Sequence, residues 1–205
     1  MILFIKYKSY ETIGSKAFRK NIGYATINQY WDISCRPDPD FNQHYPSTGL
    51  CRSPTVQTFM LRNHTNIDRV FYFYTFSVNS NHYVAIVGSF CIRQCFNSHM
   101  DAYLWFSHHA RFIPFNVVTN NIGQYRPCMC TGHTQFAPPD IKYFKRRNNP
   151  YIILEWKNNR INHSRAPVIL PANRFVNWLI SQNARLLGGG FFNNLGQLQN
   201  TAIIL

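Results

Sequence analysis

The stretch Arg69-Val-Phe-Tyr-Phe-Tyr-Thr-Phe-Ser-Val-Asn-Ser-Asn-His-Tyr-Val-Ala-Ile-Val-Gly-Ser-Phe-Cys91 decides the fold of this chain. Residues 69–75 and 83–91 are rich in β-branched and aromatic side chains, which are enriched in strands. The segment 78–81 between them, Val-Asn-Ser-Asn, has the short polar character of a hairpin turn. We therefore predict an antiparallel β-hairpin in the middle of the chain.

Further elements lie on both sides of this hairpin. Before it, residues 2–7 are apolar enough for a buried strand, residues 9–21 favour a helix, and residues 22–27 return to strand character. After it, residues 140–144 and 151–156 flank a polar, basic turn and predict a second hairpin.

Two segments extend this frame. Residues 36–66 are rich in proline and polar side chains without periodicity, so we expect a long surface insertion. Residues 173–187 carry apolar side chains at helical spacing, and Gly188–Gly190 would end that helix as a C-cap. We predict a single domain over residues 1–205 with a C-terminal extension from about residue 183. Its fold class is α/β, with a curved or barrel-like mixed sheet and helices packed around it.

The charge of the chain is strongly unbalanced. It has 21 Lys and Arg against 8 Asp and Glu, a net charge of +13, and 16% aromatic residues. A cationic surface attracts phosphates, and aromatic faces allow bases to stack. Basic chains also bind anionic membranes or acidic proteins, but the charge together with the rings favours nucleic acid.

The cysteines and the apolar runs indicate a compartment. The chain has 6 Cys, and we expect no secretory signal, because the apolar start Met1–Ile5 is short and is followed at once by Lys6 and Lys8. We therefore expect reduced thiols and an intracellular location, cytoplasmic or nuclear. The most apolar run, residues 70–91, is interrupted by polar residues, so we expect no membrane segment.

One group of residues offers a catalytic alternative. Asp140, Glu155 and Lys157 have the loose spacing of a metal-dependent nuclease, in which two carboxylates bind a cation and a Lys lies near the attacked phosphate. The same residues also fit an ordinary hairpin with a polar surface.

The cysteines offer a zinc alternative. Cys128 and Cys130 precede His133, and Cys91 lies near Cys95, but neither group has the two Cys-x2-Cys pairs typical of a structural zinc site. We therefore expect free thiols and predict no metal and no cofactor.

Two aromatic side chains follow predicted strands. Tyr24 lies at the end of an early strand, and Trp105 follows a later one beside His108 and His109. A Tyr and a Trp that converged on one pocket would hold a flipped or methylated base between flat faces. Each ring taken singly also fits a hydrophobic core.

Several segments, in order, resemble one protein family. They are Phe4–Tyr10, Asn21–Thr26, Phe73–Asn79 with Tyr83–Gly88, Trp105, Arg111-Phe112, and Asn158–Arg165 with residues 168–171. Together they are similar to the YTH domain, a PUA-like module that reads N6-methyladenosine in RNA. The likeness covers most of residues 2–35 and 69–182.

The resemblance implies a binding module that is not an enzyme. Tyr24 falls at the first wall of the family's aromatic cage, Trp105 at the second, and His108 near the third. The remaining base-pocket residues that it implies are Tyr10, Gly14, Ala25 and Asn28. Those that it places beside phosphates are Lys8, Ser9 and Arg165. The implied partner is single-stranded RNA, or DNA, that carries a methylated adenine.

Three positions depart from the family pattern. Gly14 stands where the family has an Asp or Asn that bonds the adenine edge, Ala25 replaces a Ser or Cys, and Tyr24 replaces a Trp. A missing side-chain partner costs roughly 1–3 kcal/mol of discrimination. Two alternatives therefore stay open: a metal-dependent nuclease, and a YTH-like domain that binds RNA without methyl specificity.

Overall fold

The computed structural model describes residues 1–6, 45–49, 54–114, 116–126, 145–157, 168–199 and 202–205. The chain divides into two compact units. The first unit comprises Met1–Ile33, Asn66–Cys91 and Trp156–Leu205, and the second unit comprises Ser34–Thr65 and Ile92–Glu155. The prediction of one domain over the whole chain stays a prediction.

The first unit contains the predicted hairpin. Its strands β3 (Arg69–Val78) and β4 (Asn81–Phe96, of which 81–91 belong to this unit) pair antiparallel. The turn residues Asn79 and Ser80 have φ angles of 48° and 65°, the left-handed conformation that a tight hairpin turn requires. The hairpin is therefore confirmed, with strands longer than predicted.

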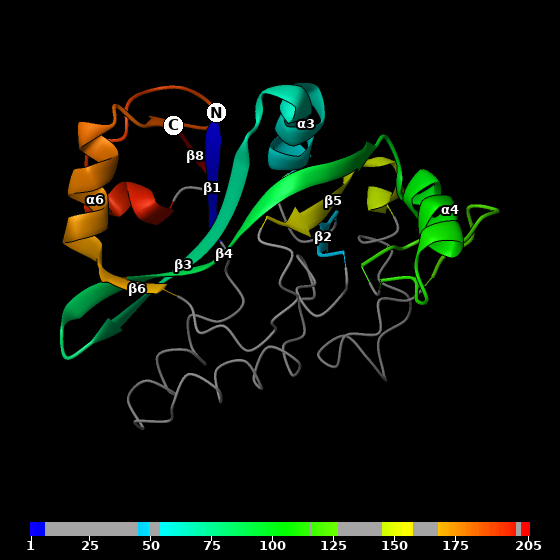
Figure 1. Ribbon diagram of the computed structural model, residues 1–205, viewed down its shortest axis with the longest axis horizontal. Coiled ribbons are helices and arrows are strands. Elements are labelled where there is room, and N and C mark those ends of the chain that lie inside the picture. Colours follow the sequence, from blue (N-terminus) through cyan, green and yellow to red (C-terminus); the bar gives the residue numbers. More distant parts are fainter. Residues whose placement is uncertain (7–44, 50–53, 115, 127–144, 158–167, 200–201) are drawn as a thin grey trace. The chain divides into compact units, whose positions relative to one another are not determined.

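Four further strands extend the sheet of the first unit. β1 (Ile2–Lys6) runs parallel to β3, which confirms the predicted first strand, and β8 (Ala202–Ile204) runs antiparallel to β1. β7 (Arg185–Leu186) pairs with β8, and β6 (Val168–Pro171) pairs with β4. Figure 1 shows β1 and β8 side by side, with both chain termini at the same end.

One helix of the first unit covers its core. α6 (Ala172–Ser181) buries a face whose members are three or four residues apart: Ala172, Phe175, Val176 and Leu179. The ring of Phe175 lies 5.5 Å from that of Phe4 on β1 and 6.0 Å from that of Phe73 on β3. The core of this unit is thus a helix packed on apolar strands.

The end of α6 corrects one prediction. The helix ends at Ser181 instead of reaching residue 187, because Asn183 adopts a φ of 54° and the next residues pair with β8. Gly188–Gly190 have φ angles of 107°, 111° and 85° and form a turn after β7, not a helix C-cap. Strand pairing has overridden the helical spacing of the sequence here.

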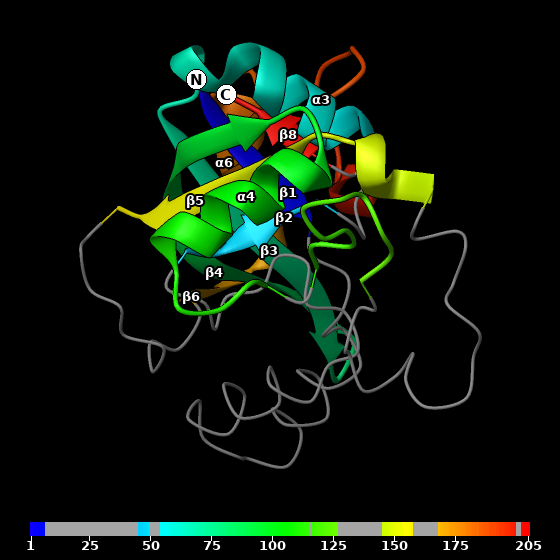
Figure 2. The same cartoon turned by 90° about the vertical axis from the view of Figure 1, so that its right-hand side faces the viewer.

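The described residues of the second unit form two α-helices and a short strand pair. The helices are α3 (Pro54–Asn63) and α4 (His99–His109), and β2 (Ser47–Thr48) pairs antiparallel with β5 (Tyr151–Trp156). The predicted strand over residues 151–156 is confirmed. Figure 2 shows α4 in front of β2 and β5. The buried core of this unit includes Ala102, Phe106, Val117, Tyr151 and Ile153.

The segment 36–66 is more regular than we predicted. Its described part contains β2 and α3, and α3 buries Val56, Gln57 and Met60. Pro54 suits the first position of a helix, where its missing N–H costs nothing. The expectation of an irregular surface insertion was therefore wrong for these residues, while residues 36–44 and 50–53 lie outside the described part.

The strand order confirms the fold class. It runs β2-β5-β4-β3-β1-β8-β7, with β6 also on β4, and it mixes parallel with antiparallel neighbours. The chain is therefore α/β with a mixed sheet. The order has two ends, so the sheet is open over the described residues and does not close into a barrel. The predicted helix at 9–21 and the predicted strands at 22–27 and 140–144 lie outside those residues.

Candidate functional site

Most residues implied by the YTH resemblance lie outside the described part of the chain. These are Lys8, Ser9, Tyr10, Gly14, Tyr24, Ala25, Asn28 and Arg165. The structure places the other two, Trp105 and His108, on α4. The side chain of His108 is exposed, and the ring that stacks on Trp105 belongs to its neighbour His109.

Trp105 lies in a row of rings on the second unit. The His109 ring stacks on the indole with centroids 4.5 Å apart and planes at 7°, and Tyr45 meets the indole edge-on at 5.4 Å. The guanidinium of Arg93 lies 4.7 Å from the centre of the Tyr45 ring. We call these four residues, Arg93, Tyr45, Trp105 and His109, the Trp105 row.

Helix α4 accounts for the position of the Trp105 row. Ser98 caps the helix, since its hydroxyl accepts a hydrogen bond from the Asp101 backbone N–H at 3.2 Å. Ala102 and Phe106 face the core. Trp105 and His109 are four residues apart, which places them on one side of the helix, half-buried and exposed respectively. His109 Nδ1–H also donates to the Trp105 carbonyl at 2.8 Å, which fixes the ring in its stack.

Arg93 also contacts Glu155, one of the carboxylates of the nuclease alternative. Its Nη1 lies 3.1 Å from Oε1 of Glu155, and the two side chains are 37% and 41% exposed. An ion pair this exposed contributes little to stability. The guanidinium of Arg93 nevertheless binds the carboxylate that the nuclease alternative assigns to a metal ion. Asp140 lies outside the described residues, and the residues that are described contain no group of three or more His, Cys, Asp or Glu able to hold a metal ion.

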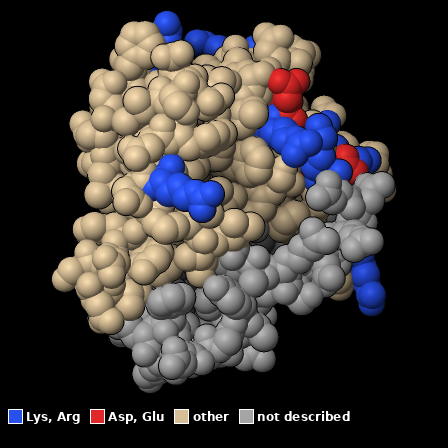
Figure 3. Space-filling view, turned by 60° about the vertical axis from the view of Figure 1, so that its left-hand side comes forward, with Lys and Arg blue, Asp and Glu red and all other residues tan. Residues whose placement is uncertain are grey.

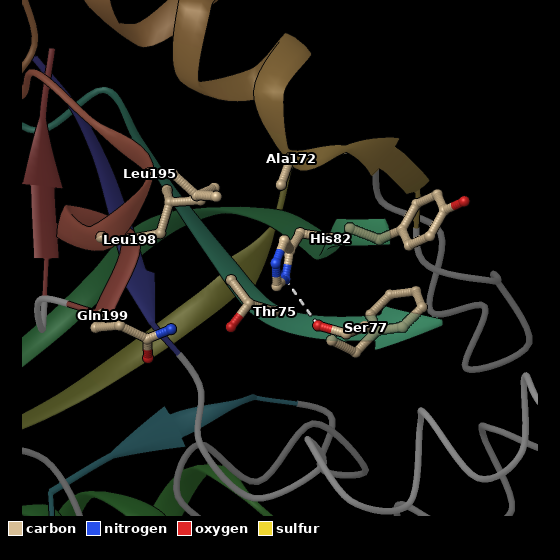
Figure 4. Close-up of a pocket in the computed structure, with 10 residues that line it drawn as sticks. Thr75, Ser77, His82, Ala172, Leu195, Leu198 and Gln199 are labelled. Carbon is tan, nitrogen blue, oxygen red and sulfur yellow. Dashed lines mark hydrogen bonds between the residues drawn. The ribbon is translucent and has the colours of Figure 1, made fainter. Parts of the chain in front are cut away.

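The first unit carries a pocket of about 480 Å³ near the turn end of its hairpin. Figure 4 shows polar Thr75, Ser77 and Gln199 along its lower side, Ala172, Leu195 and Leu198 along its upper side, and His82 between them. Ser77 Oγ and His82 Nδ1 are hydrogen-bonded at 2.8 Å. Phe76, Tyr83 and Gly196 complete the lining. We call this cavity the hairpin pocket.

Basic side chains lie at several places on one face of the molecule (Figure 3). On the face shown in Figure 3, Lys and Arg side chains occupy several separate places, and the few acidic side chains lie beside basic ones. The basic stretch that we predicted as the turn of a second hairpin forms a 3-10 helix, Lys145–Asn148. The charge therefore supplies a general attraction for anions and does not by itself mark one site.

The two described cysteines bear on the zinc alternative. Neither Cys91 nor Cys95, the two cysteines in the described ranges, forms a disulfide. Burial raises the pKa of the Cys95 thiol to about 12, so it remains protonated near neutral pH. Cys128, Cys130 and His133 lie outside the described residues.

Sequence reasoning missed Tyr45, Arg93 and the hairpin pocket. Tyr45 lies in the segment that we expected to be an irregular insertion, and Arg93 lies on a strand that we ended at residue 91. The apolar and aromatic residues Ile92, Cys95 and Phe96 beside Arg93 were the available signal for a longer strand. The pocket brings residues of the hairpin together with residues 195–199, and no sequence pattern links those two segments.

Comparisons with protein-family models, with curated proteins and with solved structures find no match to this chain. The YTH resemblance therefore rests on the sequence segments quoted above. Among the helices in the described ranges, none has the length and apolar character needed to cross a bilayer.

Proposed function

We propose that this chain binds single-stranded RNA and holds one flipped, N6-methylated adenine against the ring of Trp105. The observation that carries the proposal is the stack of His109 on Trp105, 4.5 Å apart and nearly parallel. Among the described residues, the indole is anchored in a core on one side and covered by the exposed His109 ring on the other, which makes it a platform for a base. Stacking of a base on such a ring contributes roughly 1–3 kcal/mol.

A bound base would either displace the His109 ring from the indole or stack on the outer face of that ring. His109 is exposed, whereas Trp105 also contacts Tyr45 and Phe96, which hold the indole in place. Exchange of one flat ring for another keeps the Trp105 face covered, so the exchange costs little. A methylated amine is easier to remove from water than an unmodified one, and its methyl group adds contact area on the indole.

Electrostatics favours a polyanion over a neutral ligand. The net charge is +13, and Arg93 lies at one end of the Trp105 row. Its ion pair with Glu155 is exposed and therefore exchangeable for a phosphate. Affinity that depends on phosphates falls as the salt concentration rises. The proposed activity is binding without catalysis, and single-stranded DNA is the alternative ligand.

The experiment measures fluorescence anisotropy of a labelled single-stranded RNA with one N6-methyladenosine. Trp105→Ala should lower the affinity about tenfold or more, because the stacking surface is lost. His109→Ala should keep or raise it, because the indole becomes more open. Phe112→Ala is the matched control, since this ring is 65% exposed and belongs to no described cluster. Equal affinities of the wild type and Trp105→Ala would refute the proposal.

A further inference from the structure

The hairpin pocket of the first unit has the size and chemistry of a small-molecule site. Its volume of about 480 Å³ falls within the roughly 300–1,000 Å³ of ligand sites, which combine apolar walls with a few placed polar groups. The pocket lies within the first unit, and Trp105 belongs to the second. We infer that it binds a nucleoside monophosphate, independently of the RNA site proposed above.

The polar side of the pocket is rich in hydrogen-bond donors. It offers the hydroxyls of Thr75 and Ser77, the His82 ring and the Gln199 amide. Ser77 binds Nδ1 of His82, and among the described residues nothing is hydrogen-bonded to Nε2, which is therefore available to a ligand. Among the described residues, no Asp or Glu lines the pocket, so an anion meets no like charge from them.

Lys6 orients the Gln199 amide at this wall. Its side chain is 1% exposed, and its ammonium donates a hydrogen bond to Oε1 of Gln199. With Oε1 engaged, the end of Gln199 that remains for a ligand is the amide NH₂, a donor. The polar side therefore fits a phosphate group.

The opposite side of the pocket fits a flat, apolar ring. On this side, Leu198 and Ala172 are buried, while Leu195 is 40% exposed and so leaves apolar surface in contact with water. The Phe76 and Tyr83 rings stack on each other at 5.4 Å with an angle of 20° between planes, and they border the same hollow. A ligand with a phosphate at one end and an aromatic ring at the other satisfies both sides, and a nucleoside monophosphate is such a ligand.

The test is isothermal titration of the whole chain with AMP, adenosine and inorganic phosphate. We expect one AMP per chain, with adenosine and phosphate each at least about tenfold weaker, because each lacks one half of the ligand. His82→Ala and Gln199→Leu should each lower AMP affinity about tenfold. His64→Ala is the matched control, because His64 is exposed and bonds only within its own helix end, to the Leu61 carbonyl at 2.9 Å.

Two results would overturn this inference. One is no binding of AMP, and the other is AMP affinity that neither His82→Ala nor Gln199→Leu changes. The failure of this inference can be distinguished from the failure of the RNA proposal. Binding of the methylated oligonucleotide without binding of AMP would refute only the hairpin-pocket inference. Binding of AMP without binding of the oligonucleotide would refute only the Trp105 proposal.

Discussion

The cores of the two units are built from different interactions. The first unit buries apolar side chains of its strands and of α6, among them Phe4, Phe73 and Phe175. The second unit buries a polar network beside its apolar cluster: Ser47 Oγ lies 2.7 Å from the Tyr151 hydroxyl, and that hydroxyl donates to Asn116 Oδ1 at 2.5 Å. Asn116 Nδ2 also donates to the Ser47 carbonyl at 2.9 Å.

The difference determines what holds each region in place. Apolar burial has no preferred direction, so a core of the first kind tolerates small shifts but loses stability with lost volume. A buried hydrogen-bond network depends on direction, and a donor or acceptor that loses its partner cannot find water. The second unit, which carries Trp105, is therefore the more specifically positioned of the two.

The largest effect should come from a cavity in the first core. Phe73 is 0% exposed, so Phe73→Ala should lower the free energy of unfolding by about 3–5 kcal/mol. Chemical denaturation measures this change. Phe112→Ala, at a ring that is 65% exposed, should stay within about 0.5 kcal/mol. A loss below about 1 kcal/mol for Phe73→Ala would contradict the apolar account of this unit.

A smaller loss should follow from breaking the polar network. Asn116→Ala removes three hydrogen bonds at a side chain that is 0% exposed, and we expect a loss of about 2–3 kcal/mol in the free energy of unfolding. Asn177→Ala on the exposed face of α6 is the matched control and should cost nothing, because Ala favours helix. If the two variants unfold alike, the network does not stabilise the second unit.

The smallest effect should appear as a pH dependence of the same region. His99 donates through Nε2–H to the Gly49 carbonyl at 3.1 Å and accepts from the Val118 N–H through Nδ1 at 3.3 Å, so it is neutral in the fold. Burial lowers its pKa from 6.5 to about 4. The unfolded chain therefore binds more protons between these two values, and stability should fall as the pH drops from 6.5 towards 4.

The change in thermal midpoint between pH 7 and pH 5 measures this contribution. His99→Gln removes the titrating group, and the drop in midpoint should then be smaller than in the wild type. An equal drop in both proteins would show that His99 stays unprotonated in the unfolded chain or is charged in the folded one.

The sequence was a good guide to strands that are built from continuous apolar and aromatic runs. The hairpin, β1 and β5 follow from runs of β-branched and aromatic residues, which report local geometry. The second part of the predicted helix over residues 173–187 failed, because pairing of Arg185–Leu186 with β8 is a long-range interaction that helical spacing does not contain.

The candidate site was predicted less completely. Trp105 could be singled out as a large ring beside histidines, but the partner that stacks on it is His109 and not His108. Tyr45 and Arg93 reach the row from distant parts of the sequence, and only the fold brings them together. The hairpin pocket has no local signature for the same reason.

The central claim is that a methylated adenine is held on Trp105. Its most direct test is a titration of the wild-type chain with two RNAs that differ only in one N6-methyl group. Because burial of one methyl group contributes about 0.8 kcal/mol, the account predicts roughly fourfold tighter binding of the methylated strand. Equal affinities for the two strands would contradict methyl recognition, and no binding of either strand would contradict the account as a whole.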